Sequence, residues 1–521
     1  MTTTKIALKD TKRFSSLFLD YLDQKPELSP FYHRFPTVEN FGEQLREKAA
    51  SFPMAHRMIT AQVLRNQYAS LQRFDAVKEN LRLMMKDKNT FTITTGHQLN
   101  IFTGPLYFIF KIVSVINTCK ALKEAYPEYN FVPVYWMASE DHDFAEIAYF
   151  HLFGKKYRWE TEQSGAVGRM NPQELKVILE ALPEALPLFE EAYLKKKTLA
   201  EAVAHYVNEL FGKDGLLVLD ADNNGLKSLF RPVIRKDLFE HEAQQIVQQT
   251  SEELVNAGYK AQVHPREINF FYLMKDVRER LVKNENGDFE VLNKGWTMSA
   301  KEIDQLIEKS PERFSPNVVM RPLYQEWILP NLGYCGGPGE LAYWLQLKPM
   351  FEHFKVPFPI LLPRHFGMIF SKNLQHKWEK IGLPADEIFR NAEDIKADYI
   401  NKESEQEINL EENVKALAEV FAAIKSKAHE VDQSLEGFIG AEEAKALKSL
   451  NNIEKRLKKS EERKHETGLK QIDSVLEKLF PGGGLQERHD NFLNFYLNNE
   501  DFLEELKAAF IAFDFRFNVM S

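Results

Sequence analysis

The 521-residue sequence is poor in cysteine and has no long apolar run, and each absence excludes a class of protein. Its only cysteines, Cys119 and Cys335, lie far apart in the chain, which argues against a disulfide scaffold or a cysteine-rich metal site and indicates a reducing compartment. No segment approaches the roughly 20 apolar residues of a membrane span, because Lys111 interrupts the best candidate, which begins at Pro105. The N-terminus has no apolar core of signal-peptide length. We therefore expect a cytoplasmic protein without a membrane partner.

An excess of positive charge is also missing. The net charge is −9 and the pI is near 6.0, so no global field attracts nucleic acid or anionic membranes. In the charged block at residues 454–466, Glu alternates with Lys and Arg, which is typical of a solvated helix face. We expect no nucleic-acid partner. The sequence also lacks GxGxxG and GxxxxGK[ST], so neither a dinucleotide fingerprint nor a P-loop is indicated.

The segment from residue 91 to 139 reads as strand, helix and strand. "TFTITT" and "YNFVPVYWMAS" are strand-like, and "GPLYFIFKIVSVINTCKALKEAY" between them is helical. Uninterrupted apolar strands are typical of a parallel sheet covered on both faces. "GLLVLDAD" (215–222), "EINFFYLM" (267–274) and "VPFPILLPR" (356–364) predict further strands. The predicted fold class is α/β, with a Rossmann-like parallel sheet and inserted connecting segments.

The C-terminal third has a different pattern, a heptad repeat. Nine apolar positions alternate steps of four and three: Leu410, Val414, Leu417, Phe421, Ile424, Ala428, Val431, Leu435 and Phe438. A second amphipathic helix follows Gly437 and Gly440, so we predict an antiparallel helical coiled coil ended by "PGGG". "FDFRFNVM" (513–520) predicts a strand that returns to the core. The predicted divisions are 1–151, 152–212 as an insertion, 213–383 with a second insertion, 384–480 as the coiled coil, and 481–521.

Polar residues gather in the loop between the first strand and its helix. In open α/β sheets this end of a strand forms the ligand crevice, and a helix N-terminus there favours anions. The loop residues are Gly96, His97, Gln98, Asn100, Thr103 and Gly104. They predict a binding loop, and the alternative is a purely structural connection.

A second polar group follows the second strand in "ASEDHDFAE". It contains Glu140, Asp141, His142 and Asp143. Carboxylates beside an imidazole suit three tasks: binding a metal, accepting a proton from an amine, or holding sugar hydroxyls. No second ligand cluster is evident, so no metal is predicted. The alternative is a polar helix start.

A third group surrounds "LGYCGGPGELAYW" (332–344). We expect a glycine-rich loop containing an inert Cys335, followed by a helix, which together wall a pocket or cradle an anion. Its candidate residues and those of the flanking segments are Gly336, Gly337, Gly339, Glu340, Tyr343, Arg321, Gln325 and Arg364. The alternatives are an ordinary loop and surface arginines. Nearby, Ser299 to Glu302 predicts a helix capping box.

Taken in order, "TTGHQLNIFTGPLYFIFKIVSVI", "VPVYWMASEDHDFAEI", "SPNVVMRPLYQEWILP" and "GGPGELAYW", ahead of a coiled coil, resemble the BshC family. The family is assigned the cysteine ligase step of bacillithiol biosynthesis. The resemblance implies a Rossmann-like core with connecting segments and a coiled coil through which two copies form a homodimer. It also implies a ligase that adds cysteine to the amine of glucosaminyl malate, the last step of the pathway.

The resemblance also suggests roles for the candidate residues. Amide formation needs an activated carboxyl group, so ATP is a possible cofactor, with Gly96, His97 and Gly104 at its site. The candidate catalytic residues are His97 and Glu140 to Asp143. His97 and Gln98 would act as donors, and Glu140 to Asp143 would bind the amine or sugar hydroxyls, with one of them as general base. Arg321 and Arg364 would bind the malate carboxylates. Two alternatives stay open: a metal-dependent hydrolase centred on "SEDHD", and a non-enzymatic scaffold built on the coiled coil.

Overall fold

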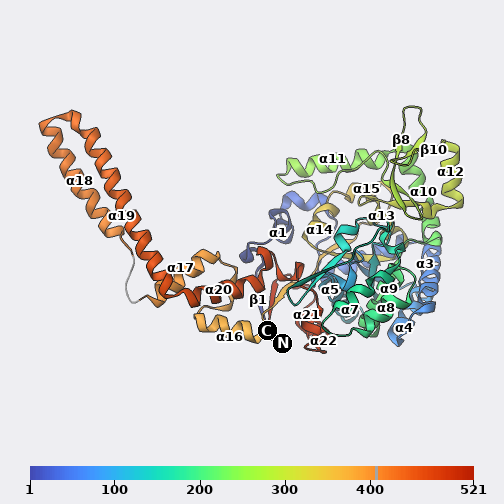
Figure 1. The fold of residues 1–521 in the computed structure, drawn as a ribbon. Coiled ribbons are helices and arrows are strands. Elements are labelled where there is room, and N and C mark those ends of the chain that lie inside the picture. Colours follow the sequence, from blue (N-terminus) through green and yellow to red (C-terminus); the bar gives the residue numbers. More distant parts are fainter. Residues whose placement is uncertain (405–408) are drawn as a thin grey trace. The chain divides into compact units, whose positions relative to one another are not determined.

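The computed structural model describes residues 1–404 and 409–521, apart from the side chains of residues 385 and 386. Residues 405–408, within the predicted 384–480 segment, lie outside the described residues. The chain divides into two compact units, residues 1–368 with 485–520, and residues 369–484 with 521. Figure 1 shows the helices and strands that make up each unit.

A five-stranded parallel sheet forms the centre of the first unit. Its strands are β2 (Thr90–His97), β3 (Asn130–Met137), β6 (Leu217–Asp220), β12 (Asn331–Gly336) and β13 (Ile360–Pro363). They lie in the order β13-β12-β2-β3-β6, and every neighbouring pair is parallel. From β2 the chain first extends the sheet toward β6 and then returns to the other side of β2. The predicted Rossmann-like sheet is confirmed, and its topological switch point lies between β2 and β12.

Helices cover this sheet because its strands are buried almost throughout. The helix α5 (Tyr107–Ala125) packs on β2 and β3, α9 (Leu199–Phe211) packs on β6, and α14 (Pro338–Trp344) packs on β12 and β13. A helix that is apolar on all sides is expected in an interior, and α5 buries most of its residues. The other helices of this unit are α1 (Ser16–Leu22), α2 (Val38–Ser51), α3 (Met54–Gln67), α4 (Asp75–Lys86), α6 (Phe144–Ile147), α7 (Lys176–Ala181), α8 (Pro187–Lys195), α10 (Asn224–Glu240), α11 (Glu242–Asn256), α12 (Ala300–Lys309), α13 (Met320–Ile328), α15 (Lys348–His353), α21 (Leu493–Tyr496) and α22 (Phe502–Ala509).

Two sequence expectations about strands are wrong. "EINFFYLM" forms β7 (Phe270–Met274), but β7 belongs to a separate antiparallel sheet of order β10-β9-β8-β7-β11, because it pairs with β8 and β11. The other strands of that sheet are β8 (Val277–Lys283), β9 (Phe289–Val291), β10 (Trp296–Met298) and β11 (Phe314–Pro316). The glycine-rich segment around Cys335 is not a loop but β12, which lies between β13 and β2 in the parallel sheet. Its glycines suggested a turn, yet all six residues of the strand are buried.

The termini meet in a small sheet of the same unit. The strand β1 (Thr3–Ile6) pairs antiparallel with β15 (Phe517–Met520), and β14 (Phe366–Ile369) lies on the other side of β15. The predicted return of the C-terminal strand to the core is therefore confirmed. The remaining strands, β4 (Tyr149–Leu152) and β5 (Lys155–Arg158), form an antiparallel pair between β3 and β6 in sequence.

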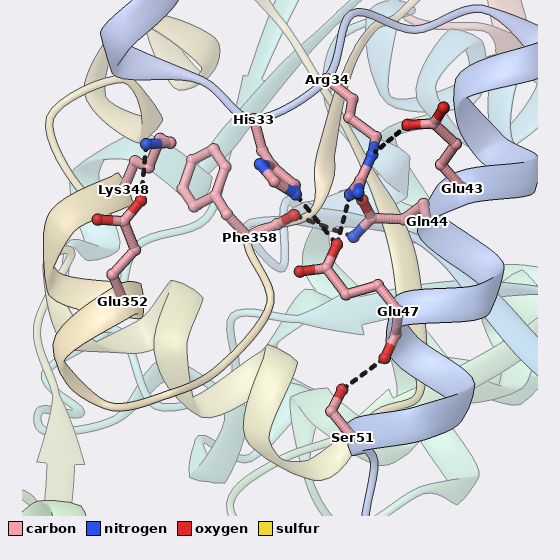
Figure 2. A network of polar contacts seen from close by, with 9 residues as sticks. All are labelled: His33, Arg34, Glu43, Gln44, Glu47, Ser51, Lys348, Glu352 and Phe358. Atoms are coloured by element: carbon pink, nitrogen blue, oxygen red, sulfur yellow. Dashed lines mark hydrogen bonds and ion pairs between the residues drawn. The ribbon is translucent and has the colours of Figure 1, made fainter.

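The helix α2 is held to the core by polar contacts at its N-terminal half (Figure 2). Arg34 pairs with Glu43 and Glu47, and Gln44 Nε2 donates to the carbonyl oxygen of Phe358 at 3.0 Å. One turn further along α2, Lys48 is fully buried and its Nζ lies 3.1 Å from Glu326 Oε2 on α13. The N-terminal helices thereby supply a buried cation to the core.

The second unit is helical and confirms the predicted antiparallel coiled coil. Its long helices, α18 (Glu411–Val431) and α19 (Glu436–Lys464), pack against each other as a hairpin (Figure 1), with Lys425 of α18 paired to Glu443 of α19. The shorter helices are α16 (Lys372–Ile381), α17 (Ala392–Glu403) and α20 (Glu466–Leu479). Because α16 packs on α20, this unit begins at Ile369 and not at residue 384.

The predicted position of the hairpin turn is wrong. The helix α18 ends at Val431, where Asp432 becomes extended and its Oδ1 accepts from the N–H of Ser434 at 2.8 Å. Such local side-chain bonds compete with helix continuation. Leu435 and Phe438 therefore lie beyond the seam of α18, and Gly437 and Gly440 lie inside α19, at a cost of about 1 kcal/mol each relative to alanine.

The Ser299–Glu302 capping box at the start of α12 is confirmed, with the side chain and backbone bonds both present. Within residues 1–404 and 409–521, no helix is long and apolar enough to cross a membrane.

Candidate active site

A cavity of about 800 Å³ opens at the carboxyl ends of the parallel strands. Gly96 and His97 line it from β2, Trp136 and Met137 from β3, and Tyr334 from β12. These strands flank the switch point, which is where open α/β sheets place their ligands. The antiparallel sheet adds Phe271 of β7, Arg278 of β8 and Pro316 of β11 to one wall.

Most of the candidate residues line this cavity, although they come from five separate segments of the chain. Those in its lining are Gly96, His97, Gln98, Glu140, Asp141, His142, Arg321, Gly337, Gly339, Glu340, Tyr343 and Arg364. Those outside its lining are Asn100, Thr103, Gly104, Asp143, Gln325 and Gly336. The fold thus brings most of the candidate residues to one cavity and leaves the others outside its lining.

The far half of the 96–104 loop has a structural role. Gly104 has φ +64, and a Cβ there would lie 2.4 Å from the Cβ of Asn100. Thr103 is also left-handed, at φ 71. The buried Asn491 secures this backbone, because its Nδ2 donates to the carbonyl oxygens of Phe102 at 2.7 Å and Gly104 at 2.6 Å. These residues fix the path of the loop and do not present it to a ligand.

The expectation of an anion site at the N-terminus of α5 does not fit this geometry. The helix begins at Tyr107, two residues after Pro105. The N–H of Leu106 donates to the carbonyl oxygen of Asp490 at 2.7 Å, and that of Phe108 donates to Pro105 at 3.0 Å. Two of the first backbone donors are therefore already engaged by the protein.

A buried lysine occupies the place between β2 and β12 instead. Lys111 of α5 is 2 % exposed, and its Nζ donates to the carbonyl oxygen of Gly96 at 2.8 Å and contacts Glu340 Oε2 at 2.6 Å. Glu340 also accepts from the N–H of Gly337 and from the hydroxyl of Tyr334 at 2.7 Å. Burial raises the pKa of Glu340, but the charge of Lys111 and the Gly337 N–H outweigh it, and the net pKa is lowered.

Arg364 follows β13 and is held by the C-terminal segment. Its Nη2 pairs with Glu487, and its Nη1 donates to the carbonyl oxygen of His365 at 2.8 Å. Glu487 is fully buried and also accepts from the N–H of Gly367 at 3.0 Å. Both terminal nitrogens of Arg364 thus already make a bond within the protein, and its Nε has no partner among the described residues.

Arg321 of α13 donates fewer hydrogen bonds within the protein than Arg364 does. Its guanidinium lies 5.4 Å from the ring centre of Tyr334, and its Nη1 donates to Gln325 Oε1 at 3.1 Å. The predicted ligand residue Gln325 is fully buried, and its Nε2 donates in turn to Glu326. Gln325 therefore orients Arg321 and does not meet a ligand.

The "SEDHD" residues are engaged with neighbouring cations. Glu140 Oε1 lies 2.5 Å from Lys227 Nζ, and Asp141 accepts from Gln98 Nε2. Arg278 Nη1 donates to His142 Nδ1 at 2.6 Å. Asp143 caps α6 by accepting from the N–H of Glu146.

Several buried polar atoms at the cavity have no hydrogen-bond partner among the described residues. They are His97 Nε2, Gln98 Oε1, Arg321 Nη2 and Arg364 Nε. His97 and Arg364 are 8 % and 2 % exposed, and an unpaired polar atom at that burial costs about 1–3 kcal/mol. Burial, with the charges of Lys111 and Arg364, lowers the pKa of His97 well below its usual range, so the ring is neutral at neutral pH. Four convergent unpaired groups indicate a polar ligand.

Four residues of the site were missed from the sequence: Lys111, Lys227, Arg278 and Arg488. A lysine inside a helix that is apolar on every side was a usable signal for Lys111. Lys227, Arg278 and Arg488 stand in ordinary charged segments, and only the fold brings them to the cavity or to Glu140. Cys335 is buried in β12, and burial raises the pKa of its thiol to about 12, which supports the prediction that it is inert.

Comparison with known proteins gives the same result along the whole chain. Residues 1–365 match the family model described as "Bacillithiol biosynthesis BshC, N-terminal Rossmann-like domain", and residues 367–521 match "Bacillithiol biosynthesis BshC, C-terminal coiled-coil domain". A relative from Flavobacterium psychrophilum is 43% identical over 509 residues, which is 95% of each chain. One from Flavobacterium johnsoniae is 41% identical over 532 residues, 100% of each chain. Both relatives are named "Putative cysteine ligase BshC".

Proposed function

Because this chain belongs to the BshC family of bacillithiol biosynthesis, we propose that it is a ligase that joins L-cysteine to the amine of glucosaminyl malate, in the last step of that pathway. The reaction forms an amide bond and needs an acceptor site for a sugar amine that carries two carboxylates. The charge balance of the cavity supports such a site.

Most acids of the cavity are already matched by cations. Each pair has a short contact: Lys111 with Glu340, Lys227 with Glu140, Arg278 with Asp141, and Arg364 with Glu487. Three lining arginines, Arg266, Arg321 and Arg488, make no ion pair within the described residues. Arg321 and Arg488 are the two that lie near the strand ends. Arg488 lies 5.7 Å from the ring centre of Tyr107.

The guanidinium groups of Arg321 and Arg488, which lie near the strand ends, suit a ligand with two carboxylates. Malate carries two, and a charge-assisted hydrogen bond contributes about 1.5–3 kcal/mol. We therefore assign the malate carboxylates to Arg321 and Arg488, and this replaces the pair Arg321 and Arg364 expected from the sequence. The unpaired Nε of Arg364 remains as a donor for a hydroxyl or carbonyl oxygen, and the unpaired Nε2 of His97 is a donor or an acceptor according to the tautomer of the ring.

A nucleotide fits the 96–104 loop less well. Gly104 lies outside the cavity lining, the first N–H groups of α5 are engaged, and a triphosphate would need more free cations than the loop offers. The ATP requirement stays a prediction, and the assay below tests it.

The first experiment is mass-spectrometric detection of bacillithiol. The full-length protein is mixed with cysteine and glucosaminyl malate, with and without ATP and magnesium. Product only with ATP supports an activating ligase, and no product under either condition, from folded protein, contradicts the proposal. Metal bound to the purified protein, together with loss of activity on adding a chelator, would instead favour the metal-dependent hydrolase alternative centred on residues 139–143.

The carboxylate assignment is tested by the Michaelis constant of the sugar substrate. Arg321→Gln and Arg488→Gln should each raise it about 10- to 100-fold, the range that corresponds to a lost charge-assisted bond. Arg82→Gln is the matched control, because Arg82 pairs with Glu79 on the surface of α4. With a glucosamine acceptor that lacks malate, the two variants should behave like the wild type. An unchanged Michaelis constant in both variants would refute the assignment.

The coiled coil supports a proposal about assembly. No residue of α18 or α19, both fully described, is buried in the single chain. Val420, Ile453 and Leu457 are 54%, 48% and 45% exposed. We assign this apolar surface to a second copy of the chain, in a homodimer that works in the cytoplasm. Deleting residues 390–480 would abolish the function of a scaffold, whereas an enzyme would lose only its dimer.

A further inference from the structure

Four adjacent residues, Glu140 to Asp143, are the candidates for the base that an amine acceptor requires. An amine attacks a carboxyl carbon only as the neutral form, so its ammonium proton must first be removed. Asp143 lies outside the cavity lining, and its Oδ1 caps α6. The choice therefore falls among Glu140, Asp141 and His142.

Asp141 is unsuited to this task because its carboxylate is stabilised in the charged form. It accepts from Gln98 Nε2 and from the N–H of His142, and Arg278 Nη1 lies 3.5 Å away. Burial raises the pKa of Asp141, but these hydrogen bonds and the Arg278 charge hold it well below its usual range. A carboxylate with a low pKa is a weak proton acceptor.

His142 is unsuited for a geometric reason. Arg278 Nη1 donates to His142 Nδ1 at 2.6 Å, and a guanidinium group donates only. The ring proton of the neutral imidazole must then be on Nε2. The lone pair that could accept a substrate proton is already used.

Glu140 meets the requirements that its neighbours do not. It lines the cavity, and its Oε1 is fixed by Lys227 Nζ at 2.5 Å. Lys227 is fully buried and also donates to the carbonyl oxygen of Phe314 at 2.7 Å, so its ammonium group cannot move away. The second oxygen of Glu140 makes no hydrogen bond to the part of the chain that the structure describes, and it remains open to a ligand.

Charged and titratable groups face Glu140 from every side. Lys227 comes from α10, Arg278 from β8, Tyr324 from α13, and Asp220 and Asp222 from the end of β6. Arg169 holds Asp222 through two bonds of 2.7 and 2.8 Å, and Ser139 donates to Asp220. Burial raises the pKa of Glu140 to about 7, with Lys227 lowering it and Asp222 raising it.

We propose that Glu140 removes the proton from the ammonium group of the acceptor substrate, and that Lys227 and Asp222 are positioning residues which set its strength as a base. The inference rests on the proposed ligase function. In this step the N–H bond of the ammonium breaks, its electron pair stays on nitrogen, and the proton passes to the Glu140 carboxylate. A base whose pKa lies near the working pH contributes about 10²- to 10⁴-fold to the rate.

The test uses two substitutions with opposite expected effects. In the wild type, kcat/KM should fall at low pH as Glu140 becomes protonated, and this fall is the acid limb of the pH profile. Lys227→Met removes a cation that favours the carboxylate, so the acid limb should move to higher pH by about one unit or more. Asp222→Asn removes a repelling charge and leaves Arg169 unpaired, so the limb should move to lower pH. A merely structural role would not move the limb in two directions.

Further variants complete the design. Glu140→Gln should remove the limb and lower kcat about a hundredfold or more. Asp214→Asn is the matched control, an acid paired to Lys507 at 2.8 Å and outside the cavity lining, and it should leave the profile unchanged. The inference is overturned if the acid limb of the pH profile stays in place in Lys227→Met and Asp222→Asn, or if it moves in the same direction in both.

A readout without turnover separates this inference from the proposed function. Carboxyl ¹³C NMR of glutamate-labelled protein identifies Glu140 as the signal that disappears in Glu140→Gln. Its titration should move up in Lys227→Met and down in Asp222→Asn. If the wild type forms no product at any pH, the ligase proposal fails and the NMR titration alone decides the positioning. A Glu140 signal that titrates near the ordinary glutamate value overturns the inference in either case.

Discussion

The buried pair Lys48–Glu326 offers a stringent test of the energetics. Lys48 and Glu326 are each 1 % exposed, with 3.1 Å between Nζ and Oε2. Glu326 Oε1 also accepts from Asn331 Nδ2 at 2.6 Å and from Gln325 Nε2 at 3.1 Å. Lys48→Met keeps most of the apolar stem but leaves the carboxylate without its cation. Removing one partner of a buried ion pair costs about 3–5 kcal/mol.

The cost should depend on pH in a defined direction. Burial raises the pKa of Glu326, and Lys48 opposes that shift, so the variant raises the pKa further. The folded variant then takes up a proton more readily than the unfolded chain. The loss in free energy of unfolding is complete above the pKa that Glu326 has in the folded variant. Below that pKa the loss shrinks by up to about 1.4 kcal/mol per pH unit, until the pH reaches the pKa of Glu326 in the unfolded chain.

The assay is urea unfolding at pH 8.5 and 5.5, followed by tryptophan fluorescence, which reports mainly on the first unit because only Trp378 lies in the second. The variant should lose about 3–5 kcal/mol at pH 8.5 and less at pH 5.5. Lys48→Met with Glu326→Gln should recover most of the loss, because the amide oxygen still accepts from Asn331. Lys78→Met, at an exposed pair on α4, is the control and should leave the midpoint unchanged. A loss below about 1 kcal/mol that is the same at both pH values would refute the reasoning.

Two further predictions concern the loop and the assembly. Asn491→Ala leaves the carbonyl oxygens of Phe102 and Gly104 unpaired, so it should destabilise the first unit by about 1–3 kcal/mol and speed amide exchange in the 100–106 loop, whereas the exposed Asn498→Ala should not. Val420→Asp places a charge on the exposed face of α18 and should shift the chain from dimer to monomer in sedimentation equilibrium, while Val177→Asp, 73 % exposed on the other unit, should not. A dimer that survives Val420→Asp places the interface elsewhere.

Most local elements, and the residues that come together at the cavity, could be predicted from the sequence. Continuous apolar strands identified β2, β3, β6 and β13, because strands buried on both faces carry no polar alternation. The heptad steps identified the helical hairpin in the same way. The polar residues at the strand ends pointed to the crevice because parallel strands bring their carboxyl ends to one edge. Local patterns of this kind depend on residues close in the chain.

The pairing of residues from distant segments could be read only from the folded chain. Arg278, Arg364 and Arg488 are far apart in sequence. The fold brings Asp141 close to Arg278 and Glu487 close to Arg364, so these two arginines form ion pairs and Arg488 does not within the described residues. The glycines of β12 suggested a loop because the neighbours that bury the strand are not local. The strength of Glu140 as a base depends on Lys227, which is 87 residues away in sequence, and on Asp222, which follows a different strand. Pairing of charges and burial are properties of contacts between distant segments, and no local pattern encodes them.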